Sequence, residues 1–267
     1  MMDFGMPYLL EMHSVEECCL LAKELGLAFV ELNANFPDCD LDRLDYAQLR
    51  RCMEQYGIYF TLHVEEECNP FAFNGAVRAA WLNTLRRSFL LAAALDMPVV
   101  NMHLPAGVYI TLPDRKTYLF SQYRNEYMSA CKELRDLCEE MLADTDAVLC
   151  IENTSGWQAH EQEAIGYLIE SPKIALTLDI GHNHGAGLVD EPFFRQHSRK
   201  LHHMHGHDAL GRKNHLPLGD GEIDLQERFA WAEKQQARIV LETKTIEALR
   251  TSVARLPEIL AEKAKKS

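Results

Sequence analysis

Acidic and imidazole side chains follow several apolar runs of the sequence, at the point where each run ends. The largely apolar run at residues 174–178 ends in Asp179, turns through Gly181 and offers His182. A buried parallel strand is a nearly continuous apolar run, so its last polar side chains leave the core as metal-type ligands. Four successive run ends carry such groups: Glu152, Asp179, His205 and Glu242. One alone is most often a helix cap or a surface group, but four in succession indicate a common cause.

The elements that must position these groups follow from the hydrophobic pattern. Short apolar runs alternate with longer segments of helical period, which is typical of βα units and a parallel sheet. Eight strands are predicted, at residues 5–10, 28–31, 59–63, 99–103, 148–152, 174–179, 201–205 and 238–242. Eight parallel units in about 250 residues match a (β/α)8 barrel, whereas a doubly wound sheet more often has five or six strands. We therefore predict the α/β class, with a single TIM barrel domain over residues 1–267.

The carboxyl ends of all strands of such a barrel meet on one face, and that face carries the active site. Seven of the eight predicted strands end in a titratable group there: Glu31, His63, His103, Glu152, Asp179, His205 and Glu242. A barrel needs none of these residues in order to fold. A single histidine is more often a hydrogen-bonded structural residue than a ligand, but convergence with the other groups favours a functional site.

The composition restricts the partners of the protein. A net charge of −13, from 27 basic and 40 acidic residues, disfavours nucleic-acid and membrane surfaces, which need clustered Lys and Arg. The only basic run, at residues 262–267, is expected to be a frayed helix end. Eight cysteines lack C-x-x-C spacing and several lie in apolar segments, which predicts a reducing, cytoplasmic setting. No apolar run approaches the ~20 residues of a membrane span.

Four motifs carry a resemblance to a known family. They are Glu152-Asn153, Asp179-Ile-Gly-His182, His205-Gly-His-Asp208 and Gly219-Asp-Gly-Glu-Ile-Asp224, followed by Glu242. Over nearly the whole chain, the sequence resembles the xylose-isomerase-like barrel superfamily of sugar isomerases and epimerases, inositol catabolic enzymes and endonuclease IV. The resemblance implies a divalent metal ion held by Glu152, Asp179, His205 and Glu242, with His182 beside the substrate. The ligand could instead be His203 or His207, which share the face of His205 by alternation; the matching offset to Asp208 favours His205.

The donor set itself restricts the metal and the reaction. Three carboxylates and one imidazole favour Mn²⁺, Mg²⁺ or Co²⁺ in an open octahedral site, and Zn²⁺ is also compatible. Such an ion can polarise a carbonyl and an adjacent hydroxyl. Glu152 and Glu242, approaching from opposite sides, could then remove and return a proton on carbon, as in similar sugar epimerases. The alternative is that both glutamates are ligands only.

The residues around this centre are candidates for binding the substrate. The loop 206–218 contains Arg212, Lys213 and His215, and is either a solvated flap or places a cation over a substrate hydroxyl, carboxylate or phosphate. The predicted substrate-binding residues are Glu31, His63, His103, His182, Lys213 and His215. Four aromatic residues after strand ends could form the pocket walls or simply pack in loops: Phe71, Phe73, Tyr109 and Trp157.

Three functions follow from these residues. The first is a metal-dependent isomerase or epimerase of a sugar, polyol or 2-oxo acid, with one divalent ion per chain and a possible homo-oligomeric state. The second is an endonuclease IV-like phosphodiesterase, for which His63 and His103 would hold extra zinc ions. By the resemblance, its third zinc site would need an aspartate where this chain has Lys213, and an ammonium cannot ligate a cation. The third is a catalytically silent barrel that binds a sugar or its metal.

Overall fold

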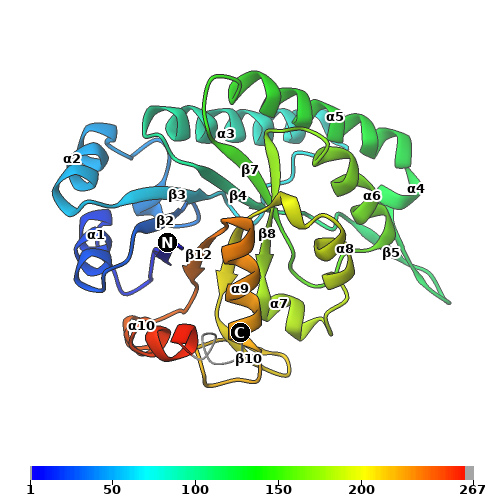
Figure 1. Cartoon of the computed structure of the whole chain (residues 1–267). Helices are drawn as coiled ribbons and strands as arrows, with labels where there is room; N and C mark the ends of the chain where they lie inside the picture. Colours follow the sequence, from blue (N-terminus) through cyan, green and yellow to red (C-terminus); the bar gives the residue numbers. More distant parts are fainter. Residues whose placement is uncertain (1, 262–267) are drawn as a thin grey trace.

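The predicted apolar runs pair side by side as the eight parallel strands of a closed barrel in the computed structural model, which describes residues 2–261 (Figure 1). The strands are β1 (Phe4–Pro7), β2 (Phe29–Asn33), β3 (Tyr59–His63), β4 (Val99–His103), β7 (Val148–Glu152), β8 (Ile174–Asp179), β9 (Leu201–Gly206) and β12 (Arg238–Leu241). They follow chain order around the barrel, and β12 closes it against β1. The predicted (β/α)8 architecture is confirmed.

Four strands have the predicted bounds, and the other four differ at their ends. The strand expected at residues 5–10 ends at Pro7, because the chain turns away and leaves Leu10 exposed. β2 extends two residues beyond the predicted end to Asn33, which pairs with His63 of β3. β9 likewise extends to Gly206, and β12 stops one residue before Glu242. Each difference is at an end, where the last ladder pair depends on the neighbouring strand.

The helices surround the barrel. They are α1 (Val15–Glu24), α2 (Tyr46–Tyr56), α3 (Gly75–Ala94), α4 (Leu119–Gln122), α5 (Arg124–Met141), α6 (Ala159–Leu168), α7 (Ile180–Gly185), α8 (Glu191–Gln196), α9 (Leu225–Gln235), α10 (Ile246–Ala261) and the 3-10 turns η1 (Pro37–Cys39) and η2 (Ser198–Lys200). α3 buries Leu85 and Phe89 against the barrel, whereas Val77 in its first turn is 45% exposed. Within residues 2–261, no helix has the length and apolar character needed to cross a bilayer.

The barrel interior is built from bulky side chains that approach the backbone closely. Phe29 and Phe60 are fully buried on neighbouring strands. A Cβ atom at Gly5 would lie 2.5 Å from the Phe29 ring, so β1 and β2 pair closely only because residue 5 is glycine. The core below the carboxyl ends is therefore rigid, and it fixes the height of the polar residues at those ends.

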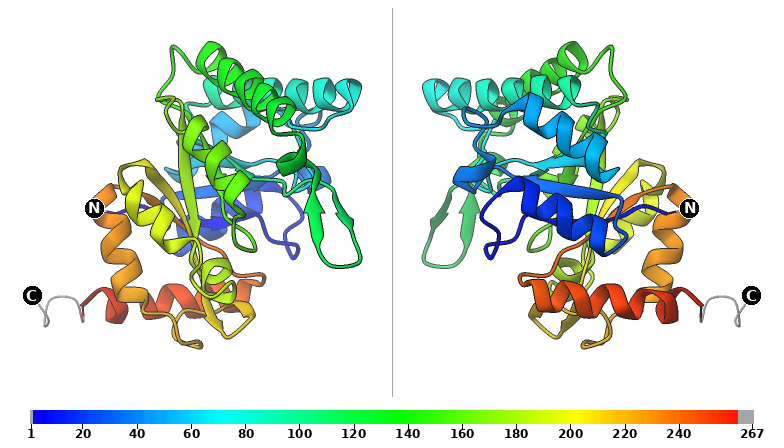
Figure 2. Two further views of the ribbon diagram at one scale, coloured as in Figure 1. Left: turned by 90° about the vertical axis from the view of Figure 1, so that its right-hand side faces the viewer. Right: turned by 90° about the vertical axis from the view of Figure 1, so that its left-hand side faces the viewer.

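Two short hairpins, which the sequence pattern did not reveal, follow the strand ends. β5 (Tyr109–Thr111) and β6 (Lys116–Tyr118) come after β4 and project from the body of the molecule (Figure 2). β10 (Asp208–Leu210) and β11 (Lys213–Leu216) come after β9 and contact α7. The expected frayed end at residues 262–267 lies outside the described residues.

Candidate active site

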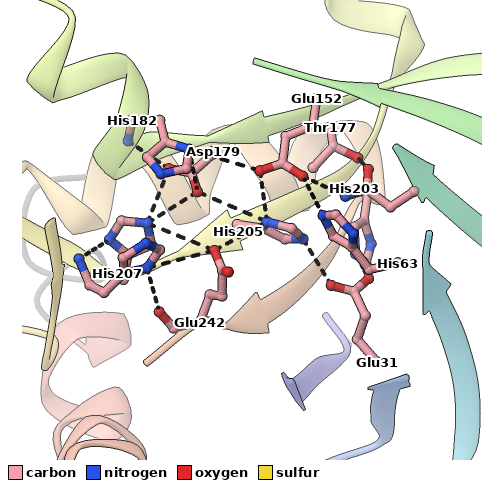
Figure 3. A network of polar contacts seen from close by, with 12 residues as sticks. Glu31, His63, Glu152, Thr177, Asp179, His182, His203, His205, His207 and Glu242 are labelled. Atoms are coloured by element: carbon pink, nitrogen blue, oxygen red, sulfur yellow. Dashed lines mark hydrogen bonds and ion pairs between the residues drawn. The ribbon is translucent and has the colours of Figure 1, made fainter. Parts of the chain in front are cut away.

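Four side chains converge at the carboxyl ends of the strands: Glu152, Asp179, His205 and Glu242. One ligand atom from each lies within 4.8 Å of the other three. Nδ1 of His205 is 3.1 Å from Oε1 of Glu152 and 3.2 Å from Oε2 of Glu242 (Figure 3). β7, β8 and β9 supply the first three residues, and Glu242 follows β12 directly. The structure thus brings together the four residues that the sequence nominated as metal ligands.

The donor set and its unsatisfied atoms fit a divalent cation. Two buried carboxylates and one partly buried carboxylate around one point repel each other unless positive charge lies among them. Oε2 of Glu242 is buried with no hydrogen-bond partner among the described residues. Carboxylate oxygens and one imidazole nitrogen are the donors that Mn²⁺, Mg²⁺, Co²⁺ and Zn²⁺ accept. Glu152, Asp179, His205 and Glu242 are therefore called the ligand quartet below.

The charge state of the ligand quartet follows from its mutual contacts. Burial alone would raise the pKa of Glu152, but His205 and His103 outweigh it and hold that pKa well below its usual range. Burial would also raise the pKa of Glu242, yet His205 and Lys244 lower it in the same way. Both carboxylates are consequently ionised at neutral pH, as ligands and proton acceptors must be.

His205 separates two layers of acidic groups. Its Nδ1 faces the three carboxylates of the ligand quartet, while Nε2 lies 2.9 Å from Oε1 of Glu31 on the opposite side of the ring. Glu31 also accepts from Thr61 and contacts His203, and it is only 2% exposed. The substrate-binding role of Glu31 stays a prediction; its carboxylate lies among these three side chains, beneath His205.

His207 contacts Asp179. This contact gives a physical basis for deciding which of His203, His205 and His207 is the metal ligand. The backbone N–H of His215 donates to Nδ1 of His207 over 2.8 Å. Nδ1 also lies 3.3 Å from the carbonyl oxygen of Asp208, and Nε2 is 3.1 Å from each carboxylate oxygen of Asp179. In this arrangement both nitrogens of His207 are engaged, so it orients Asp179 rather than offering a free lone pair.

Gly181 leaves the space that His207 occupies. A Cβ atom at residue 181 would lie 1.9 Å from Cε1 of His207. The glycine of the Asp179-Ile-Gly-His182 motif is thus explained by the close approach of an imidazole. Asp179 also accepts from the backbone N–H of His182 and so begins α7.

Amide and hydroxyl side chains hold the two strands that carry Glu152 and Asp179. Asn101 donates to Oε2 of Glu152 over 2.5 Å, and Thr177 donates to Oδ1 of Asn101 over 2.6 Å. Asn153 accepts from the backbone N–H of Asp179 and donates to its carbonyl oxygen. Sequence reasoning missed Asn101 and Thr177, although inward alternation within β4 and β8 was a signal that could have found them.

The predicted substrate-binding histidines lie around the quartet. Nε2 of His63 is 3.3 Å from Oε2 of Glu152, and Nε2 of His103 is 3.5 Å from Oε1. Burial would lower the pKa of His63, but Glu152 outweighs it and raises that pKa to about 8. On the other side, Nδ1 of His182 is 3.3 Å from Oδ2 of Asp179. Each of these rings is close enough to bind a group held at the quartet, and their substrate-binding role stays a prediction.

The hairpin after β9 places His215 near the ligand quartet but leaves Lys213 exposed. His215 has a left-handed backbone (φ 55°) and its Nδ1 lies 3.8 Å from Oε2 of Glu242, whereas Lys213 is exposed. Burial lowers the pKa of His215 to about 4, so this ring is neutral at pH 7. Sequence reasoning also missed Lys244, whose Nζ is 2.8 Å from Oε1 of Glu242. Lys244 is thus a cation that directly contacts the quartet.

Asp208 holds the hairpin and the following loop in place. Its carboxylate accepts from the backbone N–H groups of Ala209, Gly219, Gly221 and Ile223. A Cβ atom at residue 221 would lie 2.3 Å from Oδ1 of Asp208, so this packing requires glycine there. The His-Gly-His-Asp and Gly-Asp-Gly motifs therefore form one loop anchor.

The four aromatic residues considered as pocket walls have other partners. Phe71 is fully buried against Phe120 and Tyr127, and Trp157 stacks on Phe194. Phe73 contacts Phe120 and Tyr123, while Tyr109 packs on Tyr118 within the first hairpin. Loop packing accounts for all four rings.

The barrel and the polar cluster at its carboxyl ends define a class of α/β barrel protein with a metal-type site. The chain belongs to the xylose isomerase-like TIM barrel family, whose model matches residues 19–262. This confirms the family that the motifs predicted. No curated protein matches the sequence.

Solved structures show the same fold. A D-tagatose 3-epimerase-like protein is 24% identical, with 99% of each chain covered and a TM-score of 0.80. An L-ribulose 3-epimerase is 16% identical over 100% of this chain and 97% of that chain, with a TM-score of 0.76. The IolI protein, in a structure with a zinc atom, is 13% identical over 98% and 99%, with a TM-score of 0.77. At these identities the likeness shows the fold alone.

Proposed function

We propose that this protein is a divalent-metal-dependent isomerase or epimerase of a small sugar or sugar derivative. The observation that carries the proposal is the ligand quartet, with two of its carboxylates close to the same imidazole nitrogen. Membership of the family and the likeness to an L-ribulose 3-epimerase and to a D-tagatose 3-epimerase-like protein support the reaction class. The substrate class stays a small sugar, polyol or 2-oxo acid.

Each residue of the site has a separate role in the proposed reaction. A bound divalent ion would supply electrophilic polarisation of a carbonyl and its neighbouring hydroxyl. Glu152 and Glu242, ionised and placed at the ends of different strands, take a proton from carbon and return it to the same or the adjacent position. The rings of His63, His103 and His182 orient substrate hydroxyls. Lys244 offsets part of the negative charge that the three carboxylates leave in the site.

The test is proton exchange at carbon. Mn²⁺-loaded protein is incubated in D₂O with a panel of ketoses, 3-keto sugars and 2-oxo acids, and the compounds are analysed by mass spectrometry. We expect deuterium uptake by at least one compound, reduced by about 100-fold or more in Glu242→Gln. Glu222→Gln is the matched control. Glu222 is also a carboxylate near the hairpin after β9, but it pairs with His184 and Gly211 and not with the ligand quartet.

The metal content of each variant completes this experiment. If Glu242→Gln retains its metal and exchanges deuterium as fast as the wild type, Glu242 is a ligand only. Absence of exchange in every compound of the panel contradicts the isomerase proposal.

One observation favours a second candidate, the endonuclease IV-like phosphodiesterase. His63, His103 and Glu152 also form a group whose ligand atoms lie within 4.8 Å of one another, so a second cation could bind there. Two observations oppose it: the net charge is −13, and Lys213 is an ammonium in the loop that would complete a third site. Cleavage of a DNA duplex that contains an abasic site would decide for this candidate. The silent barrel predicts metal binding without proton exchange.

A further inference from the structure

The carboxylate oxygens of Glu31 lie close to polar atoms of three side chains. Thr61 donates to its Oε2 over 3.0 Å, and Nε2 of His203 lies 2.9 Å from the same oxygen. Nε2 of His205 lies 2.9 Å from Oε1. Thr61 and His203 hydrogen-bond to the carboxylate, whereas Nε2 of His205 makes an ion-pair contact with it and has no hydrogen-bond partner among the described residues. Figure 3 shows Glu31 below His205 and His203 to its right, both on the side away from Asp179.

Glu31 and His203 are a buried pair next to His205. His203 is fully buried and Glu31 is 2% exposed, and one ligand atom from each of Glu31, His203 and His205 lies within 4.8 Å of the other two. A buried carboxylate is costly unless its oxygens have polar partners, and both oxygens of Glu31 have them.

The contact has a geometric consequence for His205. A histidine that ligates a metal through one ring nitrogen donates its other N–H to a neighbouring group, which fixes its tautomer and orientation. Glu31 lies on the Nε2 side of His205, and the three carboxylates of the quartet lie on the Nδ1 side. We infer that Glu31 is a positioning residue that keeps the proton of His205 on Nε2 and its Nδ1 free to ligate. This inference rests on the metal site of the proposed function.

The test measures metal affinity and the tautomer of His205. Mn²⁺ binding to the full chain is titrated by electron paramagnetic resonance for the wild type, Glu31→Gln and Thr61→Val. An amide at residue 31 can donate to Nε2 of His205 and so favour the opposite tautomer. We expect the dissociation constant of Glu31→Gln to rise by about 10- to 100-fold. Thr61→Val, the matched control, removes a bond to the same carboxylate but leaves the carboxylate in place, so its constant stays within about threefold of the wild type.

A second measurement does not depend on a folded variant. Histidine ¹⁵N resonances of the Zn²⁺-loaded wild type report which ring nitrogen carries a proton. We expect a proton on Nε2 and the metal on Nδ1 of His205. The reverse assignment overturns the inference, as does Mn²⁺ binding by Glu31→Gln within threefold of the wild type.

Failure of this inference and failure of the proposed function give different experimental results. A wild-type protein that binds no Mn²⁺ defeats both this inference and the proposed function. A wild type that binds Mn²⁺ together with an equally tight Glu31→Gln variant defeats only the role of Glu31. Equal loss of folding stability in Glu31→Gln and Thr61→Val, without a difference in affinity, would assign Glu31 a structural role.

Discussion

Glu161 is a buried acidic residue whose protonation should make the stability of the protein depend on pH. It lies at the start of α6, the helix after the loop that follows Asn153, and it is almost fully buried. Burial raises its pKa to about 7, the backbone N–H of Gln158 lowers it, and the buried Asp190 raises it further. The folded pKa is thus above the value near 4.5 of an ordinary glutamate.

The sign of the effect follows from proton binding. Between pH 4.5 and 7 the folded state holds a proton at Glu161 that the unfolded chain has already lost, so the free energy of unfolding falls as pH rises. At about 1.36 kcal/mol per pH unit, the loss amounts to roughly 3 kcal/mol once the carboxylate is ionised in both states. Glu161→Gln removes this loss, because an amide does not titrate and can still accept from Gln158.

The assay is urea unfolding followed by circular dichroism at several values between about pH 5 and pH 8.5. Over this window the stability of Glu161→Gln relative to the wild type should increase by roughly 2 to 3 kcal/mol. Groups of the metal site titrate in both proteins and cancel in the difference. Glu163→Gln is the control on the same helix: Glu163 is exposed, and its bond to Arg124 lowers its pKa, so its difference should not vary with pH. A difference for Glu161→Gln that stays constant across the window would contradict the buried, protonated state of Glu161.

Two further substitutions probe the site. Asp179→Ala should sharply lower metal occupancy, measured by elemental analysis, while circular dichroism shows a folded barrel; full occupancy would remove the proposed quartet. Gly181→Ala should displace His207 and weaken Mn²⁺ binding about 10-fold or more, because the new methyl group collides with the ring. Gly166→Ala on α6 is its control: nothing lies within 4 Å of the added Cβ, so metal binding should be unchanged and stability should rise by about 0.5–1 kcal/mol. Unchanged Mn²⁺ affinity in Gly181→Ala would show that His207 does not support Asp179.

The sequence pattern predicted the barrel and the ends of its strands well. The apolar runs that end in Glu152 and Asp179 have the predicted bounds because both faces of a parallel strand are buried, and the pattern records this burial. Val77 continues the i, i+4 spacing of Leu85 and Phe89 but is 45% exposed in the first turn of α3, so apolar periodicity alone does not ensure burial.

The polar network between strands could not be predicted in the same way. Alternation places His203, His205 and His207 on one face, but it does not say which of them lies at the height of the other ligands. That height depends on the tilt and stagger of the barrel strands, which bring residues 31 and 203 together across the interior although they are far apart in the chain. The separate tasks of His203 and His207 follow only from these contacts.

The number of divalent ions that each chain binds decides between the proposed isomerase and the phosphodiesterase. Protein purified without chelator, or loaded with Mn²⁺ and passed over a desalting column, is analysed by elemental analysis, and crystals are examined by anomalous scattering. We predict one ion per chain, within ligand distance of Glu152, Asp179, His205 and Glu242. Two or three ions clustered on His63, His103, Glu152 and Asp179 would contradict this prediction and favour the phosphodiesterase, and a chain that binds no ion would remove the proposed chemistry altogether.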